Sequence, residues 1–220
     1  SASVAVGGPG RDLTAIVSSL GRWRAGSPAT FQAMVANHGS QAADGDIDVH
    51  GLHAVFEDAF GRIFRGEVES DDFNRLVVAA RLPAAEIVVL RAYAKYLRQI
   101  GFPLSQAFVE STLAANAGIA SGLVALFKAR FDPGAEATGD GEAAARMRAV
   151  EEALEAVDNL SEDRVLRQLL ALILATTRTN FWRRDAEGRP RSFLSLKFDP
   201  AKVPGLPEPR PMFEIFVYSP

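Results

Sequence analysis

The sequence contains no cysteine, which excludes disulfide bonds, a thiol nucleophile and zinc sites built on thiolates. It has no apolar run that could cross a membrane: the longest, residues 169–175, has seven residues against about 20 required. Phosphate-binding motifs are missing too, since residues 7–10 (GGPG) lack the Gly-x-Gly-x-x-Gly spacing and no Gly-Lys-Ser/Thr occurs. We therefore expect no nucleotide-binding fold within these residues, and the lack of cysteine is consistent with a cytoplasmic, reducing location.

An excess of charge is missing as well, so the composition selects no class of partner. The net charge is -3, with 23% charged and 48% hydrophobic residues among 220. A chain of this length buries roughly 70% of the surface that its unfolded form exposes, and so needs no metal to fold. The chain starts at Ser1 without a secretory signal and stops two residues after a predicted strand at 213–218. From these ends we expect a segment of a larger polypeptide.

A continuous apolar stripe at helical spacing starts near residue 51. Its members are Leu52, Val55, Phe56, Ala59, Phe60, Ile63 and Phe64. We expect this face to be buried, so that Phe56→Ala would destabilise the fold by about 3–5 kcal/mol. Gly66 is placed to end the helix in a left-handed conformation. Ser70 is expected to start the next helix, with Asp71 and Asp72 near its positive end.

Three further helices are predicted before residue 132. Pro83 suits the first turn of one that Gly101 ends, Ser105 caps the second, and Asp132-Pro133 stops the third. Their expected buried residues follow the helical period: Ile87, Leu90, Ala94, Leu97, Phe108, Val109, Leu113, Ile119, Leu123, Leu126 and Phe127.

Residues 132–141 are rich in glycine and proline and carry no apolar stripe, which predicts a linker. The helical pattern resumes at residue 142, and Ser161 is expected to cap a last helix. The expected buried residues of these two helices are Met147, Val150, Leu154, Val157, Val165, Leu166, Leu169, Leu170 and Ile173.

After Thr176 the pattern changes from helical to extended. Residues 181–184 and 192–198 are predicted as two strands, and residues 213–218 as a third. Seven of the 12 prolines lie in residues 190–220, so no helix is expected there. A bare edge on the third strand would favour aggregation unless further chain covers it.

The N-terminal region is less well defined. Residues 1–10 are rich in glycine, and residues 11–36 show a weak helical pattern in which Ser27 could cap a helix starting at Pro28.

We therefore predict a mainly α fold: a multi-helix bundle followed by a small antiparallel β segment at the C-terminus. The expected divisions are a poorly defined segment at 1–40, a helical domain at 41–133, a linker at 134–141, a helical hairpin at 142–176 and a β segment at 177–220.

Two groups of residues near position 45 have the chemistry of metal ligands. Asp44, Asp46 and Asp48 have the alternate spacing of a calcium loop, but valine stands at its sixth and twelfth positions, which require glycine and glutamate. A solvated acidic loop is the simpler interpretation. His38, His50 and His53 could approach zinc with Asp48 and Glu57, but surface histidines are the interpretation that we favour.

Basic residues with interleaved aromatics mark the C-terminal part. Residues 178–210 contain eight arginines or lysines against four acids: Arg178, Arg183, Arg184, Arg189, Arg191, Lys197, Lys202 and Arg210. Such a pattern can bind nucleic acid. A strand pair with one core face and one charged face is the alternative, which we favour because acids lie among the basic residues.

The segment RAYAKYLRQ indicates an amphipathic helix. It carries Tyr93 and Tyr96, with Arg91, Lys95 and Arg98 on a polar face that could dock a partner domain.

Several stretches, taken in order, resemble one protein family. They are FRGEVESDDFNRLVVAARL, VLRAYAKYLRQIG, LVALFKARFDP, ATTRTNFW and SFLSLKFDPAKVPGLPEPRPMFEIFVYSP. Together they closely resemble the large bacterial NAD-specific glutamate dehydrogenases over roughly residues 51–220, apart from 134–141. Residues 1–40 carry no resemblance.

The resemblance implies a parent enzyme that oxidises L-glutamate to 2-oxoglutarate and ammonia with NAD, acting as an oligomer. In that family regulatory modules precede this region, and the substrate-binding segment and the nicotinamide-binding domain follow it. We therefore assign no catalytic, cofactor-binding or metal residue here, and expect the isolated segment to be inactive. The expected role is to position the catalytic domain against regulatory modules or other subunits. A free-standing binding or self-association module is the alternative, with nucleic acid as its least favoured partner.

Overall fold

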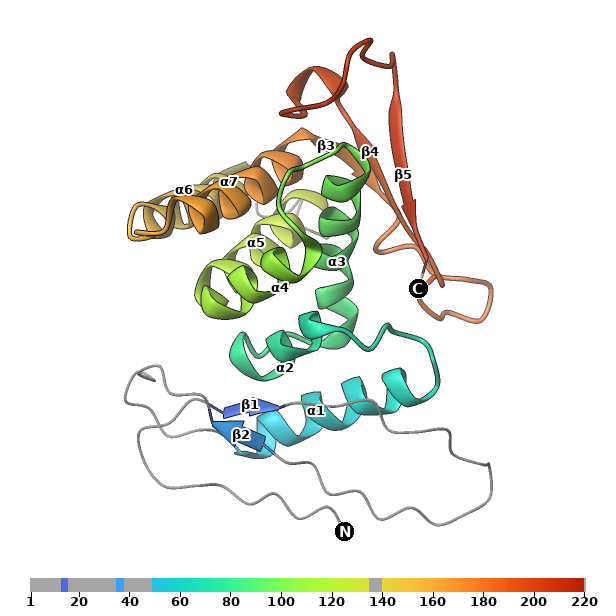
Figure 1. Cartoon of the computed structure of the whole chain (residues 1–220). Helices are drawn as coiled ribbons and strands as arrows, with labels where there is room; N and C mark the ends of the chain where they lie inside the picture. The colour runs from blue at the N-terminus through green and yellow to red at the C-terminus, as the bar shows by residue number, and fades with distance from the viewer. Residues whose placement is uncertain (1–12, 16–34, 38–48, 135–139, 220) are drawn as a thin grey trace.

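The computed structural model describes residues 13–15, 35–37, 49–134 and 140–219 (Figure 1). It is mainly helical with a three-stranded antiparallel sheet at the C-terminal end, which confirms the predicted fold class. The helical elements are α1 (Val49–Phe64), η1 (Asp72–Arg75), α2 (Leu76–Ala79), α3 (Ala84–Gln99), α4 (Gln106–Ala115), α5 (Ala117–Phe131), α6 (Asp140–Leu154), α7 (Leu160–Ala175) and η3 (Pro200–Lys202). The strands of this sheet are β3 (Thr176–Thr179), β4 (Leu194–Phe198) and β5 (Glu214–Tyr218).

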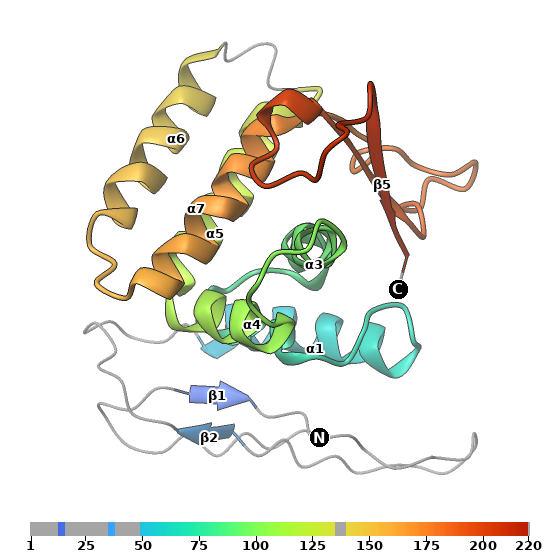
Figure 2. The ribbon, with the colours of Figure 1, turned by 45° about the horizontal axis from the view of Figure 1, so that its top comes forward.

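Helix α3 lies at the centre of the molecule. It contacts α1, α2, α4, α5, α7, η1, β4 and β5, and Figure 2 looks nearly along its axis, with the other elements arranged around it. Ile87, Val89, Leu90, Ala92 and Leu97 are all buried, so apolar side chains leave α3 in several directions. A helix that is apolar around its circumference is stable only when other elements cover it on all sides.

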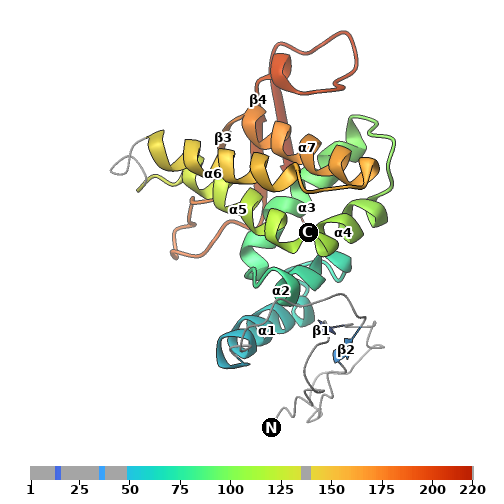
Figure 3. The same ribbon diagram turned by 90° about the vertical axis from the view of Figure 1, so that its left-hand side faces the viewer.

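Helices α5, α6 and α7 form a layer on one side of α3. They contact one another, and α6 and α7 run side by side in Figure 3. Gly122 lets α5 approach α6 closely, because a Cβ at this position would lie 3.0 Å from Cγ2 of Val150. One continuous core runs from Ala59 in α1 through these helices to Tyr218 in β5.

Several predicted helix ends are confirmed. Ser105 is the N-cap of α4, where its hydroxyl accepts a hydrogen bond from the Phe108 amide at 3.2 Å. Gly101 has a φ of 80° just after α3, and the amide of Phe102 then donates to the carbonyl of Leu97. Gly66 has a φ of 71° after α1. Left-handed glycine at this place satisfies the last carbonyl groups of the helix.

Four local predictions are wrong. Ser70 does not start a helix; Asp71 precedes the short η1 instead. Asn159, not Ser161, caps α7, because its side chain accepts hydrogen bonds from the amides of Ser161 and Glu162. Pro83 is the N-cap of α3 and not in its first turn. Phe64 was expected on the buried face of α1, but it is 62% exposed at the end of that helix.

The N-terminal part also differs from its weak helical pattern. Residues 13–15 and 35–37 are strands β1 (Leu13–Ala15) and β2 (Val35–Asn37), which pair antiparallel. A local pattern does not reveal this pairing, since the two partners lie about 20 residues apart in the sequence. Ser27, Pro28 and the side chain of Phe56 lie outside the described residues.

The strand predicted at 181–184 lies earlier in the chain. β3 occupies residues 176–179 and continues directly from α7. Phe181 and Trp182 instead follow β3 in a turn and pack their rings against Phe127 of α5, at 5.5 Å and 5.9 Å between ring centroids. Their aromatic character therefore reflects packing on a helix and not strand pairing.

Candidate functional site

The strongest concentration of buried polar contacts lies where α3 and α5 meet α7 and the sheet. We call this region, defined by Arg91, Tyr93, Arg130, Thr176 and Tyr218, the junction. Arg91, Thr176, Tyr93 and Tyr218 are at most 4% exposed. A buried polar group requires a partner, because its lost hydration is otherwise uncompensated. The contacts at the junction are therefore specific and not incidental.

At one end of the junction, Arg91 is fully buried and paired with Asp71. Its Nε and Nη2 donate to the two carboxylate oxygens of Asp71 at 2.7 Å and 2.6 Å, and Nη2 also donates to Oδ1 of Asn74 at 3.2 Å. The guanidinium lies over the ring of Phe73, 5.4 Å from its centroid. Burial disfavours the charged guanidinium, but the carboxylate of Asp71 outweighs this effect, so the pKa of Arg91 is raised. The paired fork geometry is the strongest form of such an interaction.

The hydroxyl group of Tyr218 lies near the same guanidinium. Burial raises the pKa of Tyr218 to about 12, and the positive charge of Arg91 acts against that rise. Nη1 of Arg91 and the hydroxyl of Tyr218 are both buried without a hydrogen-bond partner among the described residues. Two of the three guanidinium nitrogens of Arg91, Nε and Nη2, therefore bond to Asp71 and Asn74, and the third, Nη1, has no hydrogen-bond partner among the described residues.

Strand β5 runs back along α3 in the antiparallel sense. Tyr96 contacts Phe216 at 5.4 Å between ring centroids, and the charge of Arg91 reaches Tyr218. Five residues of helix advance about 7.5 Å, and two residues of strand advance about 6.6 Å. These lengths match, so β5 keeps contact with α3 from Phe216 to Tyr218.

The middle of the junction is held by Tyr93 and Arg130. The hydroxyl of Tyr93 is 2.7 Å from Oγ1 of Thr176, which in turn donates to the carbonyl of Leu172 at 2.8 Å. Arg130 of α5 donates to the carbonyls of Ile173 and Thr176. Burial raises the pKa of Tyr93 and lowers that of Arg130. These contacts satisfy carbonyl groups where α7 changes into β3, which a helix end otherwise leaves unpaired.

Aromatic rings fill the space between these polar contacts. Tyr96 stacks on Phe198 of β4 with 4.3 Å between ring centroids, and Tyr93 contacts the same ring edge-on at 6.2 Å. Tyr93 and Tyr96 were expected on an amphipathic helix whose polar face included Arg91. The helix is confirmed as part of α3, and Tyr93 and Tyr96 lie on its buried side. The prediction is wrong for Arg91, which is 0% exposed, whereas Arg98 is exposed.

The sequence analysis did not predict that Arg91 is buried, although its position in the helical period indicates it. Arg91 lies four residues after Ile87 and three before Ala94, both of which were expected on the buried face. A charged residue on an apolar stripe indicates a buried ion pair. Its partner Asp71 lies 20 residues earlier, and no local pattern identifies it.

Glu110 is a buried acid close to Asp71. It is 7% exposed, and its Oε1 accepts a hydrogen bond from Gln106 at 2.6 Å. Burial raises the pKa of Glu110, and the nearby carboxylates of Asp71 and Asp72 raise it further. Glu110 therefore holds a proton more readily than an exposed glutamate does.

One face of the sheet is largely uncovered by the residues that the structure describes. Paired residues share a face, so Lys197 with Ile215 and Ser195 with Val217 lie on the side away from α3. Phe213, Ile215 and Val217 are 66%, 61% and 57% exposed. We call these three residues the outer β5 patch.

The edge of β5 is open among the described residues as well, because β5 is the last strand in the order β3-β4-β5. Ser195 and Lys197 use their carbonyls on the β3 side, where Asn180 and Thr177 donate to them. In an antiparallel ladder the amides of Phe216 and Tyr218 then face β4, and those of Ile215 and Val217 face the open edge.

Three of the eight basic residues at 178–210 have an acidic partner. Arg189, Lys202 and Arg210 are paired with acids close in sequence: Asp185, Asp199 and Glu208. Lys197 lies over the ring of Phe213 at 5.0 Å, and pairs across the strands with Arg178. The favoured alternative, a strand pair with one core face and one polar face, agrees with the alternating burial of β4.

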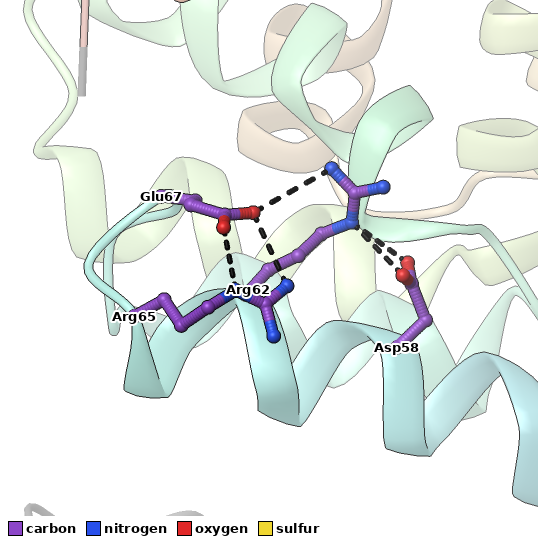
Figure 4. Close-up of polar contacts among 4 residues, drawn as sticks. All are labelled: Asp58, Arg62, Arg65 and Glu67. Atoms are coloured by element: carbon purple, nitrogen blue, oxygen red, sulfur yellow. Dashed lines mark hydrogen bonds and ion pairs between the residues drawn. The ribbon is translucent and has the colours of Figure 1, made fainter. Parts of the chain in front are cut away.

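A further charged cluster closes α1 (Figure 4). Arg62 pairs with Asp58 at 2.9 Å and approaches Glu67 at 4.0 Å, and Arg65 pairs with Glu67 at 2.5 Å. The hydrogen bond between them raises the pKa of Arg65 and lowers that of Glu67. Two positive and two negative charges cancel, which is typical of a solvated helix end and not of a ligand site.

The predicted metal ligands cannot be compared with the structure. Asp44, Asp46, Asp48 and His38, and the side chains of His50 and His53, lie outside the described residues. Within the part of the chain that the structure describes, no group of three or more His, Asp or Glu side chains could hold a metal ion. In that part no single helix is long and apolar enough to span a membrane; α4 and α5 meet the criterion only as a pair bent by 99°.

Two family profiles match the chain. The profile described as glutamate dehydrogenase, helical motif 3, matches residues 68–133, which include α3, α4 and α5. The profile described as bacterial NAD-glutamate dehydrogenase, catalytic domain, matches residues 149–220, which include α7 and the sheet. The junction therefore consists of residues from both matched regions: Arg91, Tyr93 and Arg130 from the first, and Thr176 and Tyr218 from the second.

Curated relatives agree with these profiles. NAD-specific glutamate dehydrogenases of Halomonas elongata and Pseudomonas aeruginosa are 42% and 44% identical over 175 and 178 residues, 80% of this chain. The enzyme of Mycobacterium tuberculosis is 45% identical over 169 residues, 75% of the chain. The aligned part spans only 10–11% of the length of these relatives.

Proposed function

Because this chain belongs to the family of large bacterial NAD-specific glutamate dehydrogenases, of which it matches one segment, we propose that it joins a helical module to the first strands of the catalytic domain. The complete protein would oxidise L-glutamate to 2-oxoglutarate and ammonia and reduce NAD in the cytoplasm. The segment would hold the catalytic domain in a fixed position without taking part in the chemistry.

The observation that supports this role is the shared core. Tyr93 and Arg130, in the region matched by the helical motif, bond to Thr176 in the region matched by the catalytic domain. Tyr96 and Phe198 stack across the same boundary. Two modules with a common hydrophobic core move as one body, whereas modules joined only by a linker move independently.

The chemistry of the described residues agrees with a positioning role. Hydride transfer from glutamate needs an acid or base near the α-carbon and a bound nicotinamide held in register. The buried Arg91 is instead committed to Asp71, and the half-buried Arg130 to the carbonyls at the end of α7. The buried acid Glu110 is bonded to Gln106. NAD would then be held by residues of the parent enzyme other than these.

The outer β5 patch and the open edge of β5 suggest what adjoins the segment. A bare edge strand with apolar side chains is an aggregation risk, which proteins avoid by covering it. We propose that further strands and helices of the catalytic domain cover it in the complete protein. Self-association of the segment through the same patch is the second candidate, and concentration-dependent light scattering of the 220-residue chain would reveal it.

The test compares the 220-residue chain with the complete protein that contains it. Glutamate-dependent reduction of NAD is followed by absorbance, and binding of NAD by calorimetry. We expect turnover and binding in the complete protein and neither in the 220-residue chain. Turnover by the chain alone would overturn the positioning role, and a complete protein without glutamate-dependent turnover would overturn the parent activity.

A further inference from the structure

We infer that Arg130 of α5 is a positioning residue: its guanidinium group ends α7 and sets the direction in which β3 leaves that helix. The effect on catalysis rests on the proposed function, but the contact itself does not. Arg130 lies in the region matched by the helical motif, and its partners lie in the region matched by the catalytic domain.

Helix α7 lacks the residue that usually ends a helix. Left-handed Gly66 and Gly101 follow α1 and α3, but Thr176 follows α7 directly, with a φ of -68° and a ψ of 131°, and already belongs to β3. The last carbonyl groups of a helix have no partner within it, and a left-handed residue normally helps to supply one. The end of α7 therefore needs donors from other parts of the chain.

Arg130 supplies two of these donors. Its Nη1 donates to the carbonyl of Ile173, in the last turn of α7, and its Nη2 donates to the carbonyl of Thr176, in β3, at 3.3 Å. A guanidinium group is planar, and its donors are fixed relative to one another. One rigid group therefore holds the helix and the strand on either side of the point where the chain changes direction.

Two further contacts hold single residues of the same turn. The hydroxyl of Thr176 donates to the carbonyl of Leu172 at 2.8 Å, so the hydroxyl of Tyr93, 2.7 Å away, is the donor to Thr176. The amide of Asp199, just after β4, donates to the carbonyl of Ala175 at 2.8 Å. Each of these donors reaches one residue of the turn, whereas the guanidinium group spans it.

The positive charge of Arg130 suits this position. Arg130 lies in the last turn of α5 and bonds to the last turn of α7, so it is close to the C-terminal ends of two helices. Such ends carry a partial negative charge, which favours a cation. Burial disfavours the cation and lowers the pKa of Arg130, and the two helix ends offset part of this effect.

The direction of β3 affects the position of the whole sheet. β3 pairs with β4, and β4 pairs with β5, in a region that matches a catalytic domain. A change of the backbone angle at Thr176 would shift these strands relative to the helices. Arg130 would therefore act on the reaction through position, without contact with the reacting atoms.

The experiment uses two variants at position 130 and one control. Arg130→Met removes the charge and both donors but keeps an apolar side chain. Arg130→Lys keeps the charge but replaces the planar group by a single ammonium group, so the test stands even where Arg130→Met does not fold. Lys128→Met is the matched control, because Lys128 lies in the same turn of α5 and forms a 2.6 Å ion pair with Glu86 of α3, not with α7.

The first readout is amide hydrogen exchange in the 220-residue chain. The amides of Thr176 and Asp199 both donate to carbonyls at the end of α7. We expect both to exchange at least about tenfold faster in Arg130→Met and at least about threefold faster in Arg130→Lys, while the amide of Leu123 in the middle of α5 changes less than about twofold. Lys128→Met should leave Thr176 and Asp199 unchanged relative to Leu123.

Two outcomes of this readout would overturn the inference. Wild-type exchange at Thr176 and Asp199 in Arg130→Lys would show that a positive charge is sufficient and that the planar group does not bridge the turn. Equal acceleration at Leu123 would show a general loss of stability and not a local release of the end of α7.

The second readout is catalysis by the complete protein, expressed per NAD-binding site counted by calorimetry, which removes the contribution of unfolded protein. We expect kcat for glutamate oxidation to fall about tenfold or more in both variants at position 130, with KM for NAD within about twofold, because a displaced strand misplaces reacting groups. Lys128→Met should leave both constants within about twofold of the wild type. An unchanged kcat at position 130 would overturn the effect on catalysis. A wild-type complete protein that does not oxidise glutamate would overturn the proposed function, and hydrogen exchange would still decide whether Arg130 ends α7.

Discussion

Three polar side chains of the helical body explain how it is held together and joined to the sheet. Tyr93 and Arg130 bond to Thr176, where α7 leads into β3, and Arg91 of the central helix α3 pairs with Asp71. Each would be unfavourable in the core without its partner. Because the partners come from distant parts of the sequence, these residues specify one arrangement of the helices and the sheet and disfavour others.

The ring of Phe127 is the apolar centre of the same region. It is 0% exposed and contacts Tyr93, Phe131, Phe181 and Trp182. We expect Phe127→Ala to lower the free energy of unfolding by about 3–5 kcal/mol, measured by urea denaturation. Phe213→Ala, at a residue that is 66% exposed, is the control and should change it by less than about 0.5 kcal/mol. Equal effects would contradict the assigned core.

The raised pKa of Glu110 predicts a dependence of stability on pH. Because the folded state binds this proton more tightly than the unfolded state, its contribution is fully present below the ordinary value of 4.5. It is lost as the pH rises through the raised pKa. Glu110→Gln keeps the shape and the hydrogen bond from Gln106 without the charge.

We therefore expect Glu110→Gln to match the wild type near pH 4 and to become the more stable of the two as the pH rises toward neutrality. Urea unfolding of both proteins across this range measures the difference. Gln106→Ala, which removes only the hydrogen-bond donor, should leave the pH dependence in place. A wild type that gains stability on Glu110→Gln with rising pH would refute the burial of this carboxyl group.

At the scale of elements, helix ends and strands were predicted with different success. Ser105, Gly66 and Gly101 act locally, so the sequence around them was sufficient to place the ends of α1, α3 and α4. The two errors near α7 arise from competition between neighbours. Asn159 and Ser161 lie two residues apart and both are good N-cap residues, so the sequence does not decide between them. Thr176–Thr179 follows α7 with no glycine or proline between the helix and the strand. Its β-branched residues are therefore hard to separate from the helix, and Phe181 and Trp182 give the stronger strand signal.

The cap of α7 gives an element-scale prediction. Asn159→Ala removes the acceptor for the amides of Ser161 and Glu162, at 2.9 Å and 3.3 Å, and should cost about 1 kcal/mol in thermal or urea unfolding. Ser161→Ala is the matched comparison, since Ser161 is exposed and follows the cap; its effect should stay below about 0.5 kcal/mol. A larger loss of stability in Ser161→Ala than in Asn159→Ala would show that Ser161, and not Asn159, caps α7.

At the scale of the whole molecule, the sequence was sufficient for the fold class but not for the junction. The helical period identified most of the buried apolar residues of α3, α5 and α7. The pairs Arg91–Asp71 and Tyr93–Thr176 span 20 and 83 residues and depend on how the helices cross, which no periodicity encodes. The division of the chain at 134–141 stays a prediction, and α6 contacts α5 across it.

The outer β5 patch gives a prediction that depends on the surrounding protein. Val217 lies opposite Ser195 and is 57% exposed, so Val217→Lys should change the stability of the 220-residue chain by less than about 0.5 kcal/mol. In the complete protein, where we propose that this patch is covered, the same change should cost about 2–4 kcal/mol or prevent folding, because a charge would be buried without a partner. Thermal unfolding of both forms measures this. Equal tolerance in both would show that the patch is not covered.

The central claim is that this segment positions a catalytic domain and does not itself perform hydride transfer. Its most direct test is the formation of NADH from NAD and L-glutamate by the purified 220-residue chain and by the complete protein at equal molar concentration. The account predicts NADH formation by the complete protein and none by the segment. NADH formation by the segment alone would contradict it.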